Sequence, residues 1–367
     1  MMEQVYALGI TCIQFIQDRF SDCDEYFHFV NDVSNPYHVV QYMFPFLAAI
    51  DSVFAAQFLL CIGFGNWLNT VMKWWLLEDR PYWWVRETTF YNGIDRPTVQ
   101  QFPETCETGP GSPSGHSATA ASVLILIVMW MSHVMHDRRC TARWCVWLCM
   151  CLVCTSLLSV LTARLYVAAH FPHQTLLGAL QGAFVSPFLC IYVADPYIFK
   201  YGVSVARPVK VHMWWHAVFS LLAVVVAALT YLALRAQGID PMYTVQLAFR
   251  WCMFPEHIRV TTNPLYALVS ATAMLLGWAL TVTPHVAKYR HDTKERSLII
   301  SFLSTSLIFY TIKHIEDNIC GNHAGWYYLN HFAVDVLKSF MYLRVVPYVS
   351  MWPFVKKEEV KTEKKDN

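Results

Sequence analysis

Five basic side chains stand at the ends of long apolar stretches in this sequence: Lys73, Arg80, His116, Arg164 and His170. Histidine can serve as a nucleophile, an acid or a base near neutral pH. Lysine and arginine bind the oxygens of phosphate groups. No carboxylate–histidine cluster with metal-ligand spacing accompanies them. The residue types therefore predict phosphoryl transfer that uses neither a metal nor a cofactor.

Residues 109–117 read Gly-Pro-Gly-Ser-Pro-Ser-Gly-His-Ser and join a polar loop to the apolar run 118–131. Glycine and proline exclude regular structure up to about Ser114, which is then a natural helix N-cap. The free N–H groups at a helix start, together with the helix dipole, attract anions. We therefore expect the backbone near Ser114 and Gly115 to bind an anion beside His116.

Each basic residue has a simpler explanation when it is taken alone. Lys73 or Arg80 would be a flanking residue whose side chain reaches the membrane interface. His116 would be a loop histidine, and His170 would pair with the nearby His173 at a helix start. The site hypothesis depends on all five basic residues meeting at one place.

Their positions support such a meeting. Lys73 and Arg80 are seven residues apart, so that two turns of one helix would aim both in the same direction, and Pro81 would end that helix. Arg164 closes one apolar segment and His170 opens the next, with Pro172 suited to the first helical turn.

The composition indicates an integral membrane protein. Of the 367 residues, 56% are hydrophobic and 14% are charged, whereas soluble proteins have about 25% charged residues. The apolar runs are continuous rather than alternating, which favours helices over a barrel. No basic stripe with interleaved aromatic residues suggests binding to nucleic acid.

We expect an all-α protein of about nine transmembrane helices in one bundle, formed by residues 1–355 and followed by a lysine-rich tail at 356–367. Residues 3–20 are predicted to form a short amphipathic helix. The nine expected spans lie near 37–56, 58–78, 115–135, 143–163, 168–193, 212–234, 262–283, 297–315 and 325–348.

The basic loop residues predict the orientation of these spans. Lysine and arginine concentrate after the third, fifth and seventh spans and in the tail, which we assign to the cytoplasm. The N-terminus is then non-cytoplasmic and the C-terminus cytoplasmic. The five basic site residues would share the non-cytoplasmic face. The cytoplasmic residues are Arg138, Arg139, Arg143, Lys200, Arg207, Lys210, Lys288, Arg290, Lys294, Arg296, Lys356, Lys357, Lys361, Lys364 and Lys365.

Three motifs together resemble the signature of the type 2 phosphatidic acid phosphatase superfamily. They are Lys73-x6-Arg80-Pro81, Pro113-Ser114-Gly115-His116 and Arg164-x5-His170. The flanking stretches 80–85, 101–112 and 168–174 are similar to the glucose-6-phosphatase catalytic subunit family. The resemblance is strongest from Lys73 to Gln174.

The resemblance implies hydrolysis of glucose 6-phosphate at the luminal face of the endoplasmic reticulum membrane, through a phosphohistidine. His170 would be the nucleophile, and His116 would protonate the leaving sugar oxygen and then activate water. The phosphate oxygens would be held by Lys73, Arg80, Arg164 and the backbone of Ser114 and Gly115. The implied partners are a sugar phosphate, the lipid bilayer and, functionally, a glucose-6-phosphate transporter.

Two positions depart from the superfamily pattern. Ala163 replaces a serine, with Thr162 one step earlier, and this removes one hydrogen bond to phosphate. Gln174 replaces the acidic residue that normally orients the nucleophilic histidine, so that Gln174 or His173 is expected to orient His170.

Several other residues near the motifs carry weaker expectations. Glu104 and Glu107 are expected to be solvated loop charges, with recognition of sugar hydroxyls as the alternative. Cys106, Cys252 and Cys320 would lie on the non-cytoplasmic side, where disulfides form. The sequence leaves their pairing open.

The tail ends Lys364-Lys365-Asp366-Asn367, which resembles the dilysine retrieval signal of endoplasmic reticulum membrane proteins. A charged solubilising tail is the alternative. For the whole chain, a lipid-phosphate or pyrophosphate phosphatase of the same superfamily is the main alternative. A non-enzymatic anion transporter would instead spread its cationic residues through the depth of the membrane.

Overall fold

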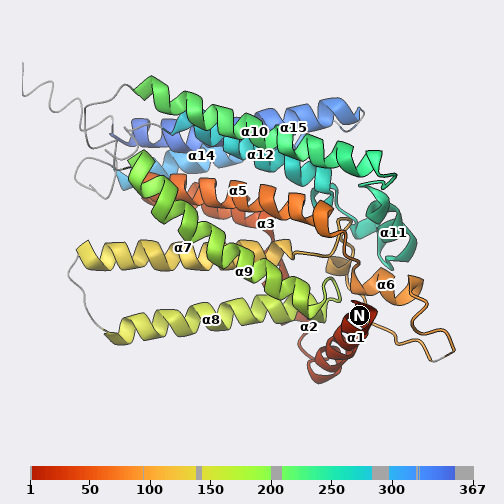
Figure 1. Cartoon of the computed structure of the whole chain (residues 1–367). Helices are drawn as coiled ribbons and strands as arrows, with labels where there is room; N and C mark the ends of the chain where they lie inside the picture. The colour runs from red at the N-terminus through yellow and green to blue at the C-terminus, as the bar shows by residue number, and fades with distance from the viewer. Residues whose placement is uncertain are drawn as a thin grey trace, which may run out of the picture. The chain divides into compact units, whose positions relative to one another are not determined.

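The computed structural model describes residues 2–93, 95–137, 143–199, 209–282, 297–319, 321 and 323–351. All regular structure in these ranges is helical (Figure 1), which confirms the all-α fold class. The tail with Lys364 and Lys365, Cys320 and most of the basic loop residues lie outside the described residues.

The described parts of the chain form two compact units. The first comprises Met1–Val39, Gly65–Pro187 and Val225–Leu268, and it holds all five basic residues of the expected site. Its elements include the C-terminal parts of α5 and α10 and the start of α12. They are α1 (Met2–Arg19), α2 (Asp24–Val33), α3 (Pro36–His38), α5 (Ser52–Leu76), α6 (Pro81–Glu87), η2 (Pro103–Thr105), α7 (Gly115–Asp137), α8 (Arg143–Tyr166), α9 (Pro172–Phe188), α10 (Val209–Ala236), α11 (Tyr243–Trp251), η4 (Pro255–His257) and η5 (Val260–Thr262).

The second unit comprises Val40–Phe64, Phe188–Val224 and the described residues from 269 on. It contains the N-terminal parts of α5 and α10 and most of α12. Its other elements are η1 (Val39–Met43), α4 (Phe44–Ile50), η3 (Leu189–Phe199), α12 (Pro264–Thr281), α14 (Leu298–Asp317), α15 (Ala324–Phe340) and η6 (Met341–Val345).

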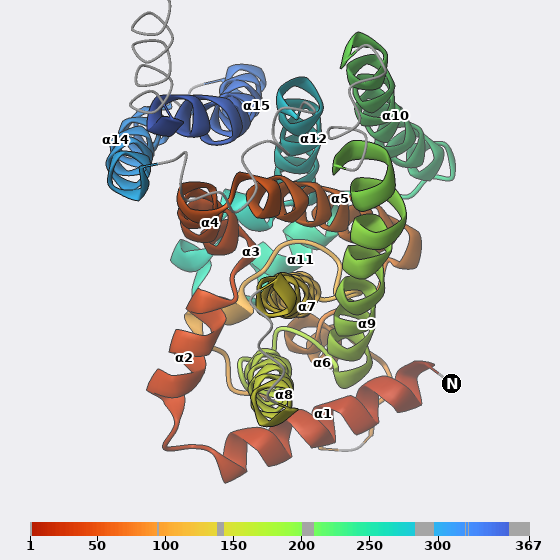
Figure 2. The same ribbon diagram turned by 90° about the vertical axis from the view of Figure 1, so that its left-hand side faces the viewer.

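The amphipathic N-terminal helix is confirmed as α1. In the first unit α7 and α8 run side by side (Figure 1), and α1 and α2 lie across α8 (Figure 2). The buried face of α1 presents Tyr6, Ile10 and Ile13. The Tyr6 ring stacks on Phe171 with centroids 4.5 Å apart. Because Phe171 follows His170, this apolar contact supports the turn that carries the histidine.

Seven helical stretches within the described ranges are long and apolar enough to cross a membrane. They correspond to the second through the eighth expected spans. They are Ser52–Glu87, Gly115–Ser132, Trp147–Tyr166, Pro172–Ala194, Trp214–Ala236, Pro264–Thr281 and Leu298–Asp317.

The first and ninth expected spans are not among the seven. Residues 37–56 are divided at Asp51, whose buried carboxylate accepts the N–H groups of Val53 and Phe54 and caps α5. Residues 325–348 include α15 and carry Asp335 and Lys338 in that helix. A count of nine therefore remains a prediction.

The link between Lys73 and Arg80 differs from the expected single helix. α5 ends at Leu76, and Leu77 has a left-handed φ of 49°. Arg80 is the N-cap of α6, and Pro81 occupies its first turn. Pro81 thus begins a helix rather than ending one, because proline is preorganised for the first helical turn. The seven-residue spacing does not place both cations on one helical face.

Two glycines let α9 approach α7 closely. A Cβ added to Gly178 would overlap the carbonyl oxygen of Ser114 and lie 3.1 Å from its backbone nitrogen. A Cβ added to Gly182 would overlap the carbonyl oxygen of Ala118. Glycine is therefore needed at positions 178 and 182, where α9 crosses the start of α7.

Candidate active site

The five basic residues come from five successive segments of the first unit. Lys73 is in the last turn of α5 and Arg80 caps α6. His116 is in the first turn of α7 and Arg164 is near the end of α8. His170 lies in the short connection between α8 and α9. Except for Lys73, whose side chain is not wholly enclosed, all of them are buried.

The turn before His170 reverses the chain at the end of α8. Ala168 has a left-handed φ of 51°. Its N–H donates to the carbonyl of Leu165 at 2.9 Å, and the N–H of Ala169 donates to that of Arg164 at 3.2 Å. These hydrogen bonds satisfy carbonyl groups in the last turn of α8. α9 then begins at Pro172, as expected from the sequence.

The hydrogen bonds of His170 fix its tautomer. Its Nδ1 lies 2.8 Å from the carbonyl oxygen of Gly111, which can only accept, so that Nδ1 carries the proton. The lone pair of Nε2 then faces Arg80 Nη1, 3.2 Å away. Burial and the neighbouring Arg80 guanidinium lower the pKa of His170 to about 3. A neutral imidazole with Nε2 unprotonated is the form that a nucleophile requires.

Backbone carbonyls hold two of the cationic side chains in place. Arg80 Nε donates to the Gly109 carbonyl at 2.6 Å, and its Nη2 to that of Pro110 at 3.2 Å. Arg80 Nη1 also donates to the Ala169 carbonyl at 3.0 Å. Lys73 Nζ donates to the Pro110 carbonyl at 2.8 Å. Backbone carbonyls of the Gly/Pro loop thus accept hydrogen bonds from both Lys73 and Arg80.

Glu107 lies among the basic groups, and the expectation that it is a solvated loop charge is wrong. Its Oε2 is 2.8 Å from Arg80 Nη1, and its Oε1 is 2.5 Å from Arg164 Nη2. His116 Nδ1 is 3.5 Å from Oε1, and His170 Nε2 is 3.6 Å from Oε2. Burial alone would raise the pKa of Glu107, but Arg164 and Arg80 outweigh it and hold that pKa well below its usual range.

Glu104, three residues earlier, differs from Glu107 in its surroundings. Its side chain is 32% exposed and pairs with His28 at 2.9 Å. The sequence offers no local signal that separates the two glutamates, because both belong to one polar loop.

The other guanidinium, that of Arg164, is held from α2. Its Nη1 donates to Asn31 Oδ1 at 2.5 Å. Its buried Nε has no hydrogen-bond partner among the described residues.

Ser114 caps α7 as the sequence predicts. Its Oγ accepts the N–H of Ser117 at 3.5 Å. Its own N–H, however, donates to the carbonyl of Gln174 at 3.0 Å. The N–H groups with no intrahelical acceptor therefore begin at Gly115.

Neither residue expected to orient His170 does so directly. Gln174 Nε2 donates to Glu78 Oε2 at 3.0 Å and to the Asp79 carbonyl at 2.8 Å. His173 also pairs with Glu78, at 2.8 Å. The Gly111 carbonyl orients the histidine instead. Gln174 instead links the start of α9 to the Glu78 carboxylate and the Asp79 carbonyl.

Neither Ala163 nor Thr162 supplies the hydroxyl of the missing serine. Ala163 is fully buried. The hydroxyl of Thr162 donates to the Leu158 carbonyl at 2.9 Å within its own exposed helix face.

A disulfide joins Cys106 to Cys252 and so anchors the loop that carries Glu107. The expected third cysteine of the group, Cys320, lies outside the described residues. Within the described ranges, no three His, Cys, Asp or Glu side chains are grouped to hold a metal ion.

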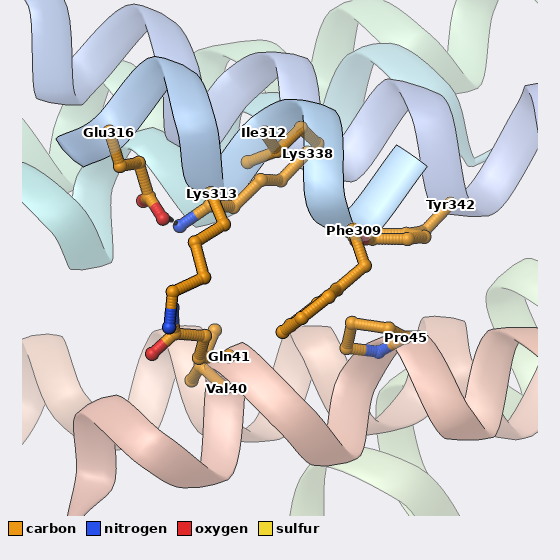
Figure 3. Close-up of a pocket in the computed structure, with 9 residues that line it drawn as sticks. All are labelled: Val40, Gln41, Pro45, Phe309, Ile312, Lys313, Glu316, Lys338 and Tyr342. Atoms are coloured by element: carbon orange, nitrogen blue, oxygen red, sulfur yellow. Dashed lines mark ion pairs between the residues drawn. The ribbon is translucent and has the colours of Figure 1, made fainter. Parts of the chain in front are cut away.

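A second buried charge cluster lies in the other unit and has a different character (Figure 3). Lys338 pairs there with Glu316 and with Asp335, the latter at 3.0 Å, and Lys313 extends toward Gln41. The cavity beside these residues measures about 10 Å³, which is room for about one water molecule. Its ion pairs satisfy one another, and no histidine lines it.

Comparison with known proteins places the chain among phosphatases. Residues 54–198 match the family model described as PAP2 superfamily. The glucose-6-phosphatase catalytic subunit 1 of Canis lupus familiaris is 31% identical over 336 residues, covering 85% of this chain and 90% of the relative. That of Haplochromis nubilus is 29% identical over the full length of both chains. The human glucose-6-phosphatase 2 is 31% identical over 75% of this chain and 76% of the relative. No solved structure gives a significant match.

Proposed function

Because this chain belongs to the glucose-6-phosphatase family and is a phosphoric monoester hydrolase, we propose that it converts glucose 6-phosphate to glucose and phosphate through a phosphohistidine. The observation that carries the proposal is the state of His170. The Gly111 carbonyl accepts a hydrogen bond from Nδ1–H, so that the lone pair of Nε2 faces Arg80 Nη1. Glu107, 3.6 Å from Nε2, also contacts Arg80, Arg164 and His116.

In the first step, His170 Nε2 attacks phosphorus in line with the ester oxygen. The P–O bond to the sugar breaks, and its electron pair goes to the sugar oxygen. His116, protonated when the dianionic substrate is bound, donates a proton to that oxygen and releases glucose. Arg80 and Arg164 face the equatorial oxygens, where charge accumulates in the transition state.

In the second step, neutral His116 takes a proton from water as the water attacks phosphorus. The P–N bond breaks, and its electron pair returns to His170 Nε2. Phosphate is released and the starting state is regained. His116 thus acts as the acid in the first step and as the base in the second, and His170 acts as the nucleophile and then as the leaving group.

The remaining contacts to the phosphate are assigned to donor groups that have no hydrogen-bond acceptor in the described part of the chain. Arg164 Nε has no partner among the described residues, and the N–H groups from Gly115 onward are at a helix start. Lys73 adds charge beside the loop. Ser114 acts through its cap on α7, because its N–H is already donated.

We further propose nine transmembrane spans for residues 1–355, with the N-terminus and the site on the luminal side of the endoplasmic reticulum membrane. The disulfide of Cys106 and Cys252 beside Glu107 supports this side, since disulfides persist in the oxidising lumen. The tail 356–367 is then cytoplasmic. If Lys364 and Lys365 form a retrieval signal, replacing both by serine releases protein to later compartments, and unchanged retention would exclude it.

A luminal site also requires its charged substrate to cross the membrane. We therefore propose functional coupling to a glucose-6-phosphate transporter. A panel of sugar, lipid and pyrophosphate substrates tests the choice of substrate, and preferential hydrolysis of a lipid phosphate would replace the sugar phosphate in the proposal.

The mechanism is tested by trapping the covalent intermediate. We expect rapid quench of the protein with radiolabelled substrate to give acid-labile, base-stable label on His170, and His170→Ala to take up none. His116→Ala should lose about 10²–10⁴-fold in turnover of glucose 6-phosphate and should accumulate label with nitrophenyl phosphate, whose leaving group needs no proton.

His173→Ala is the matched control for the labelling experiment. It removes an imidazole three residues from His170 that pairs with Glu78, and it should label as the wild type does. Label on His116, or label that persists in His170→Ala, would reverse the assigned roles. Inversion of configuration at phosphorus would indicate direct attack by water.

A further inference from the structure

The proposed reaction leaves one buried charge at the site without a role. The carboxylate of Glu107 touches both arginines, with 2.8 Å to Arg80 Nη1 and 2.5 Å to Arg164 Nη2. It also lies 3.5 Å from His116 and 3.6 Å from His170. These four partners are the groups that the reaction needs around the phosphate.

A phosphate cannot occupy this position while the carboxylate is there. In-line attack requires phosphorus about 3–3.5 Å from His170 Nε2. Glu107 Oε2 is already 3.6 Å from that nitrogen, so that its oxygen stands in the space of the phosphoryl group. Two anions in one buried pocket would also repel each other, because water screens little there.

We propose that Glu107 is a built-in counter-anion that fills the phosphate position of the free enzyme, and that substrate binds by exchanging its phosphate for this carboxylate. The inference rests on the proposed function for the identity of the site. It gives Glu107 two tasks, which are to neutralise the buried arginines in the absence of substrate and to select the anions that enter.

The first task follows from burial. The side chains of Arg80 and Arg164 are each only 1% exposed. Leaving a buried charge without a partner is strongly unfavourable. Glu107 satisfies one N–H of each guanidinium, and so the cationic pocket can persist while no ligand is bound.

The exchange is confined to the side chain, because the backbone of Glu107 is tied on several sides. The preceding residue is in the disulfide to Cys252. Tyr82 Oη donates to the Glu107 carbonyl at 2.9 Å, and the Glu107 N–H donates to that of Thr105 at 2.8 Å. The carboxylate, whose side chain is 13% exposed, can leave by rotation about its own bonds.

The second task follows from charge. A phosphate monoester dianion brings more charge and more acceptor oxygens than the carboxylate it replaces. A sulfate monoester carries a single charge, so that it would replace an equal charge already tethered in place. Glu107 therefore excludes monoanions and admits phosphate esters, and glucose 6-sulfate is the discriminating probe.

The test compares the purified full chain with Glu107→Gln, which keeps the shape but removes the charge. Glu104→Gln is the matched control, since Glu104 lies three residues away and pairs with His28 rather than with the arginines. We expect Glu107→Gln to bind inorganic phosphate at least about tenfold more tightly than the wild type, and to bind glucose 6-sulfate, which the wild type excludes. Glu104→Gln should bind both as the wild type does.

Equal or weaker phosphate binding by a folded Glu107→Gln would overturn the inference. If that variant does not fold, infrared difference spectra of the wild type with ¹³C-labelled glutamate provide the test. Phosphate binding must then shift a carboxylate band, because the exchange removes both guanidinium partners, and the absence of any shift would overturn the inference. Both readouts are binding measurements, and so a protein that turns over no glucose 6-phosphate but shows the exchange would contradict only the proposed function.

Discussion

Replacing Gly178 by alanine should change the distance between His116 and His170 without altering either side chain. The added methyl overlaps the carbonyl oxygen of Ser114 and lies 3.1 Å from that residue's nitrogen. Ser114 is two residues before His116, and its N–H is bound by the Gln174 carbonyl four residues after His170. Relief of the overlap by about 1 Å must therefore move the start of α7 relative to the turn before α9.

The magnitude follows from the two effects of that movement. Overpacking costs about 1–3 kcal/mol of stability. A misplacement of about 1 Å between reacting groups can reduce turnover about 10²-fold. We expect Gly178→Ala to lower kcat for glucose 6-phosphate by about that factor, while the KM changes less, because the arginine positions are set by other segments.

Two variants isolate the effect in assays of thermal unfolding, kcat and KM. Gly182→Ala overlaps the Ala118 carbonyl one turn farther along the same helix pair, so that it should cost similar stability but less turnover. Gly65→Ala has no neighbour within 4 Å and should be neutral or slightly stabilising. A folded Gly178→Ala with wild-type kcat would refute the close coupling of the two helix starts.

Three further outcomes follow from the contacts around His170. Gln174→Glu removes the donor to Glu78 and the Asp79 carbonyl and adds a second carboxylate there. We expect this variant to lower the unfolding free energy by about 1–3 kcal/mol, with partial recovery in the double variant that also carries Glu78→Gln. A stability equal to that of the wild type would contradict this expectation. Because the pKa of His170 is lowered to about 3 from an ordinary value near 6.5, only the unfolded chain takes up this proton between those pH values, and stability should fall as pH falls through that window. Nitrogen-15 NMR should show His170 neutral and protonated on Nδ1 at pH 5, and a His170 signal titrating near pH 6 would exclude this. In sealed microsomes, hydrolysis of a membrane-impermeant sugar phosphate should be latent until detergent opens the vesicles, whereas equal activity before and after, with no transporter present, would contradict the luminal site.

Local signals in the sequence account for the features that were predicted successfully. Apolar periodicity predicted α1, the N-cap at Ser114 predicted the start of α7, and Pro172 predicted the start of α9. Each depends on residues within one or two helical turns. Neighbouring residues were therefore sufficient to predict them.

Features set by distant contacts could not be predicted in this way. Glu107 is buried because Arg164, 57 residues later, folds against its loop. The break after Leu76 has no glycine to announce it, and Leu77 adopts a left-handed φ instead. The carbonyl that orients His170 belongs to Gly111, 59 residues earlier. Every residue has a backbone carbonyl, and so the sequence does not indicate which one contacts a given side chain.

The bond between Cys106 and Cys252 has a consequence for how the protein is made. A nascent chain that has emerged only through α9 already contains His116, Arg164 and His170, but Cys106 still waits for a partner 146 residues downstream. The disulfide that anchors the loop carrying Glu107 can form only after α11 has been translated. The pocket is thus completed only after all of its motifs have been translated, and on the proposed luminal side its completion depends on oxidative folding.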